Sequence, residues 1–106
     1  MIIKTISLGY KVSDFDSNDS SINELKDRVK IIKPLGSKIM KTTVSNEELE
    51  NGSQAVVFTC VLSFNDEEIQ KARITKLCED FQVNFQDEIE QFILAKGLVF
   101  NKILTM

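Results

Sequence analysis

The sequence predicts an α+β fold in which helices cover one face of a mostly antiparallel, four-stranded sheet. Segment 2–12 alternates apolar and polar residues, as a half-buried strand does. Segment 54–64 is apolar at nearly every position, which is typical of a central strand. Apolar residues elsewhere recur every three or four positions, as in amphipathic helices. The length, 106 residues, fits a single domain spanning 1–106.

The first half of the chain is expected to form a strand, a helix and a second strand. A capping box, Ser21 with Glu24, precedes the first helical repeat, which should end at Pro34. Residues 37–45 are rich in β-branched side chains but alternate poorly, which favours a strand at the edge of the sheet. A second capping pattern predicts one helical turn over 46–50.

The second half is expected to form two helices and a last strand. Asn65 and Glu68 have the spacing of a helix cap after strand 54–64. The apolar repeat weakens near 82–84, which predicts a break before another helix. The tail, 98–104, is apolar enough for a final strand.

The expected element order is therefore β-α-β-β-α-α-β. This order resembles the ferredoxin-like arrangement, with strands in the spatial order 4-1-3-2, if the last two helices act as one crossover. The resemblance implies that 54–64 lies in the middle of the sheet and 37–45 at its edge.

The chain contains no histidine, which removes the usual general base near neutral pH and the commonest metal ligand. Cys60 and Cys78 lack CxxC spacing and a basic activator, so we expect reduced, buried thiols, with a disulfide as the alternative. There is no glycine-rich phosphate loop. We therefore expect a protein that is not an enzyme and holds no cofactor.

An acidic loop precedes the first predicted helix. Asp14, Asp16 and Asp19 begin a calcium-loop-like pattern. However, the glycine and the final glutamate that such a loop requires are absent. The loop leaves open a weak divalent metal site, but solvated carboxylates near a helix start are the simpler interpretation.

Basic residues concentrate between 26 and 41. On a helix, Lys26, Lys30 and Lys33 would lie along one face, which suggests a nucleic-acid-associated accessory protein as an alternative function. The stacking aromatics would be Tyr10, Phe58 and Phe64. The net charge of −3 and the lack of an RNA-binding aromatic motif argue against nucleic acid.

A protein-binding or regulatory module is the preferred interpretation. Glu47, Glu48 and Glu50 form an acidic loop that can face a basic partner protein. An exposed sheet edge can add a strand from a partner, and an apolar edge at 98–104 predicts a homodimer. No apolar stretch has the length of a membrane span, so a cytoplasmic location is expected. Small size, acidity and a lysine-rich composition, with eleven lysines against two arginines, suggest one version of this module, a phage or mobile-element effector that binds a host protein.

Overall fold

The computed structural model describes residues 1–12, 14–50, 52, 54–65 and 71–105. Among these residues, a single helix takes the place of the two expected after the central strand. The elements are β1 (Ile2–Val12), α1 (Ile22–Ile32), β2 (Ser37–Glu48), β3 (Gln54–Phe64), α2 (Lys71–Ala95) and β4 (Phe100–Thr105).

The four strands form one antiparallel sheet in the order β2-β3-β1-β4. Read from β4, this is 4-1-3-2, the expected order. β3 pairs with β2 on one side and with β1 on the other, which confirms that 54–64 is a central strand. β2 is an edge strand, also as predicted. β4 forms the other edge, and its pairing with β1 shifts register between Gly9 and Tyr10.

β2 is longer than the sequence predicts. It continues to Glu48, and the helical turn expected over 46–50 is wrong. Asn46 lies opposite Val56 and Glu48 opposite Gln54, so the ladder with β3 extends almost to the hairpin turn. A long neighbouring strand offers this segment a continuous set of backbone hydrogen bonds, whereas a single helical turn would gain few.

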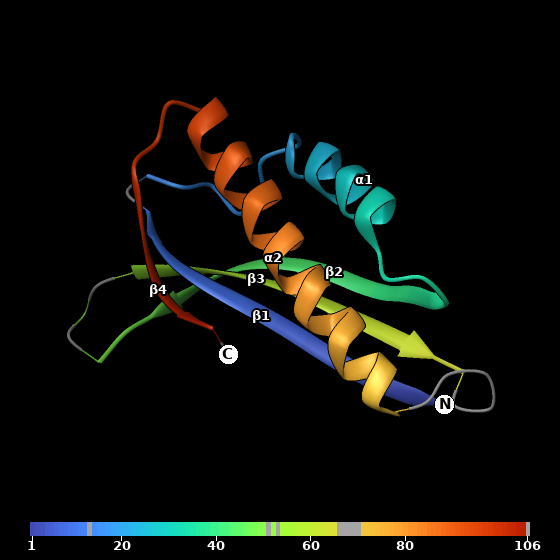
Figure 1. Cartoon of the computed structure of the whole chain (residues 1–106). Coiled ribbons are helices and arrows are strands. Elements are labelled where there is room, and N and C mark those ends of the chain that lie inside the picture. Colours follow the sequence, from blue (N-terminus) through green and yellow to red (C-terminus); the bar gives the residue numbers. More distant parts are fainter. Residues whose placement is uncertain (13, 51, 53, 66–70, 106) are drawn as a thin grey trace.

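Both helices lie on the same face of the sheet (Figure 1), which confirms the predicted layering. The break expected at 82–84 is wrong, because α2 runs without interruption for 25 residues. Phe81 and Phe85 are buried and stack with ring centroids 5.4 Å apart, so the apolar stripe continues across this segment. Val83 and Asn84 are exposed and form the outer face of the helix. The helices are unequal, with 11 residues in α1 against 25 in α2, and the layer therefore departs from the standard ferredoxin-like arrangement.

The core lies between the helices and the helix-facing side of the sheet. Alternate residues of β1 and β3 are buried there, as the strand periodicity predicts. The ring of Tyr10 makes edge-to-face contacts with Phe58 and Phe100 at centroid distances of 5.9 and 5.5 Å. The largest fully buried side chains are those of Tyr10, Phe58, Phe64, Phe81, Phe85, Leu8, Leu25, Leu62, Ile74, Ile89, Ile93 and Val29.

The start of α1 is built differently from the predicted capping box. The Ser21 side chain makes no cap hydrogen bond to the helix. Its hydroxyl and its backbone N–H instead donate to Asp19 Oδ1, at 2.8 and 2.9 Å. The other predicted cap, between Asn65 and Glu68, falls partly on 66–70, outside the described residues.

Candidate partner-binding surface at the β2 edge

The hairpin that joins β2 to β3 carries the three glutamates that the sequence singled out. Its turn is closed by the Gly52 N–H, which donates to the Leu49 carbonyl at 2.9 Å. Gly52 has φ +80°, a conformation that favours glycine. The end of β2 extends beyond both helices (Figure 1). The hairpin that carries the acidic residues therefore lies beyond the helical layer.

Glu47, Glu48 and Glu50 are all exposed, and two of them belong to a strand instead of a loop. Glu47 Oε1 accepts a hydrogen bond from the Ser45 hydroxyl at 3.2 Å. Among the described residues, no lysine or arginine forms an ion pair with any of the three. The end of β2 therefore carries three carboxylates whose charge is not neutralised by a neighbour within this part of the chain.

Among the described strands, none lies on the outer side of β2. At its start, Ser37 donates its hydroxyl to the Pro34 carbonyl, and the Ser37 carbonyl accepts from Lys33 Nζ. Further along, the Asn46 side-chain amide donates to the Phe15 carbonyl at 3.5 Å. Within the described chain, the backbone of 41–48 hydrogen-bonds to β3 alone. In a strand, alternate backbone groups face outward, so this stretch offers free donors and acceptors to a further strand.

The charges along β2 are segregated. Lys38 and Lys41 lie near its start, and Glu47 and Glu48 at its end, all exposed. A register shift between Ile39 and Lys41 marks a bulge and separates the first residues from a regular ladder over 41–48. From the sequence, Lys38 and Lys41 belonged to the element after the basic helix, and the glutamates were assigned to a loop, so nothing connected the two groups. Sequence reasoning therefore missed that both groups share one edge.

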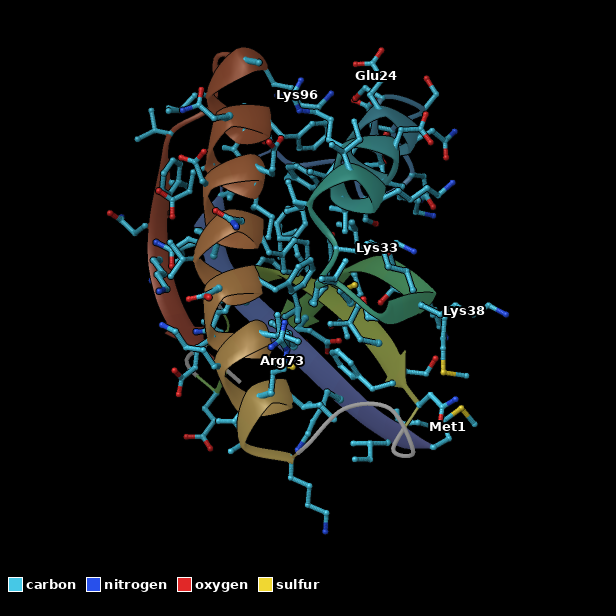
Figure 2. All side chains as sticks on the ribbon, turned by 45° about the vertical axis from the view of Figure 1, so that its right-hand side comes forward. Met1, Glu24, Lys33, Lys38, Arg73 and Lys96 are labelled. Atoms are coloured by element: carbon cyan, nitrogen blue, oxygen red, sulfur yellow. The ribbon has the colours of Figure 1, made fainter. Side chains whose placement is uncertain are left out.

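The predicted basic face on α1 is only partly free. Lys26 is half-buried, Lys30 lies 3.5 Å from the Asp27 carboxylate, and Lys33 Nζ donates to the Ser37 carbonyl at 3.1 Å. Lys33 and Lys38 lie on the same side of the molecule, at the right of Figure 2. The aromatic rings proposed to stack on bases are buried, which contradicts that part of the alternative: Tyr10, Phe58 and Phe64.

The acidic loop before α1 is held by a lysine. Asp19 Oδ2 accepts from Lys96 Nζ at 2.6 Å, and this contact joins the loop to the end of α2. Lys96, labelled in Figure 2, also lies over the Phe92 ring, 5.1 Å from its centroid. The hydrogen bond from Lys96, together with those from Ser21, lowers the pKa of Asp19 well below its ordinary value. Asp14 and Asp16 are exposed, and the described residues contain no cluster of three potential metal ligands.

Both thiols are free, as expected, but they are not equally covered. Cys60 is buried in β3, whereas Cys78 is half-buried on α2. Burial raises the pKa of each thiol, although a hydrogen bond from Thr42 opposes this at Cys60 and the charge of Lys4 opposes it at Cys78. Since the thiolate is the reactive form, neither cysteine is activated as a nucleophile.

Neither helix, among the residues that the structure describes, is both long and apolar enough to cross a membrane. The chain matches no protein-family model, and no curated protein or solved structure matches it either.

Proposed function

We propose that this protein is a non-enzymatic protein-binding module that acts through the acidic end of β2 and the free edge of the same strand. The observation that carries the proposal is the coincidence of the two features. Three exposed carboxylates without an ion-pair partner lie at the end of an edge strand whose outer backbone groups are unpaired in the described chain.

The two features perform different tasks in binding. An added strand gains main-chain hydrogen bonds whatever its sequence, so the free edge supplies affinity. The carboxylates attract a basic surface and fix which end of the partner strand lies beside them. A partner that fits is therefore an extended segment with lysine or arginine at one end.

The test is affinity capture from a bacterial lysate with the tagged full chain and a variant in which Glu47, Glu48 and Glu50 are all changed to Gln. The matched control carries Glu24→Gln, Glu79→Gln and Asp87→Asn, which neutralises three exposed carboxylates elsewhere. We expect the wild type and the control to retain a stoichiometric protein. The hairpin variant should associate with that protein on the order of tenfold more slowly, because rim charges act mainly on the association rate.

Two outcomes would overturn the proposal. In one, no protein is captured. In the other, the hairpin variant binds its protein as well as the control does. Recovery of nucleic acid, lost when Lys26, Lys30 and Lys33 are changed to Gln, would instead establish the alternative that the sequence left open.

A further inference from the structure

We infer that the strand captured by the β2 edge is β2 of a second copy of this chain, so that two four-stranded sheets join into one. The inference rests on the proposed function, because it names the partner of the same edge. It differs from the homodimer expected from the sequence, which used the opposite edge at 98–104.

The charges along β2 complement those of a second β2 strand that runs antiparallel to it. An antiparallel copy places the basic start of one strand beside the acidic end of the other. When the two strands are centred on Val44, Lys41 lies directly opposite Glu47 of the second copy, and the twofold axis repeats this pair at the other end. Directly opposite residues point to the same face of a sheet, so the two side chains can meet.

The pairs between the two Lys41–Glu47 contacts match in polarity. Thr43 lies opposite Ser45 of the second copy, Thr42 opposite Asn46, and Val44 opposite Val44. These pairs fill the regular ladder that begins after the bulge, so the bulge does not interrupt them. The even-numbered side chains, Thr42 and Val44, point to the side that packs on the helices, because they lie opposite the buried residues of β3. The twofold axis is then perpendicular to the sheet, and both helical layers lie on the same side.

Shifted registers lose these matches. A shift that centres the pair on Lys41 brings the two Lys41 side chains together, and centring on Glu47 does the same for Glu47. Edge lysines and bulges ordinarily keep sheet edges from pairing indiscriminately. Here Lys41 opposes the alignment centred on itself and favours the alignment centred on Val44. The twofold axis of that alignment gives a closed dimer instead of an open-ended assembly.

The chain segment that leads into the same edge exposes apolar side chains. Three of them lie within ten residues, at the end of α1, in the connection to β2 and at the start of β2: Ile31, Leu35 and Met40, at 83%, 75% and 51% exposure. In the proposed register half-buried Leu49 of the second copy lies next to the start of β2, where Met40 is exposed. Burial of apolar surface would then add to the main-chain hydrogen bonds.

The test is sedimentation equilibrium of the full chain over a dilution series, with charge reversals at the two paired positions. We expect the wild type to be a reversible dimer. Lys41→Glu and Glu47→Lys should each weaken dimerisation on the order of tenfold or more, since each reversal sets two like-charged pairs across the interface. The two variants mixed together, or both changes in one chain, should restore dimerisation, because opposite charges face each other again.

Lys11→Glu is the matched control. Lys11 is an exposed lysine of β1 and lies away from the β2 edge, so its reversal should leave the dimer unchanged. Three results would overturn the inference: a wild-type monomer at all concentrations, single reversals that dimerise like the wild type, or a dimer that Lys11→Glu weakens. A monomer that still captures a protein through the three glutamates would leave the proposed function standing.

Discussion

At the scale of single residues, Tyr10 brings a phenol hydroxyl into the core. Its side chain is fully buried, and its hydroxyl donates to Glu90 Oε2 at 3.1 Å. Burial, and secondarily the charge and hydrogen bond of Glu90, raise the pKa of this phenol far above its ordinary value near 10. The hydroxyl thus keeps its proton while the protein is folded.

This pKa shift predicts a loss of stability in alkali. Because the unfolded chain releases the phenol proton first, the free energy of unfolding should fall as the pH rises above about 10. Tyr10 is the only tyrosine and the chain has no tryptophan, so phenolate absorbance reports this residue alone. We expect the absorbance to appear together with the loss of circular dichroism. Ionisation near pH ~10 in a folded protein would contradict the prediction.

Tyr10→Phe is the control for that measurement. It should lower the free energy of unfolding at neutral pH by about 1 kcal/mol, the usual net value of a hydrogen bond. The difference from wild type should shrink as the pH rises, since the hydroxyl contributes less once the unfolded phenol ionises.

At the scale of elements, the periodicity of apolar residues predicted the two inner strands correctly. β1 and β3 have the expected bounds, 2–12 and 54–64, because alternation and an unbroken apolar run are visible in the chain itself. The two errors in secondary structure, at 46–50 and at 82–84, have a common cause. In each case a short, mostly polar stretch resembles a turn or a helix end when it is read alone. Packing against residues elsewhere in the sequence decides its actual structure.

The candidate site shows the same limit. The sequence singled out Glu47, Glu48 and Glu50, because a cluster of carboxylates is visible without a structure. It assigned them to a loop and did not connect them with Lys41, because the pairing of β2 with β3 decides which residues share an edge. Composition alone carries no information on that pairing.

The continuity of α2 can be tested at Asn84, which is exposed. Asn84→Pro should cost roughly 3 kcal/mol or more, because proline removes a backbone hydrogen bond and clashes with the preceding turn. Asn84→Ala should raise the free energy of unfolding by a few tenths of a kcal/mol, since alanine is the better helix former. Denaturant titrations measure both. If proline is tolerated and alanine has no effect, the helix is interrupted at this position.

At the scale of the whole molecule, the reactivity of the two cysteines can measure how much of the fold must open to expose each thiol. Cys60 lies in the central strand and is fully buried, whereas Cys78 is half-buried on α2. In Cys78→Ser, the remaining thiol should react with a disulfide reagent only through opening of the sheet. In Cys60→Ala, the remaining thiol should react without such opening.

We expect Cys60 to react at least ~1,000-fold more slowly than Cys78 in the folded protein, as a stability of roughly 5 kcal/mol implies. Its rate should rise with denaturant along the slope of global unfolding, while the rate of Cys78 should change little. Similar rates for the two thiols in the absence of denaturant would show that β3 is not shielded as the structure describes.

The position of β1 has a consequence for how the fold assembles. β1 precedes every other element in the sequence, yet it is an inner strand, and both of its neighbours come much later: Leu8 pairs with Phe58 on one side and with Thr105 on the other. The β2–β3 hairpin closes over a few residues, whereas β4 must return across nearly the entire chain. We expect the hairpin to form early and β4 to dock last. Pulse-labelled hydrogen exchange in which the Phe100–Thr105 amides gain protection before those of β2 and β3 would refute this order.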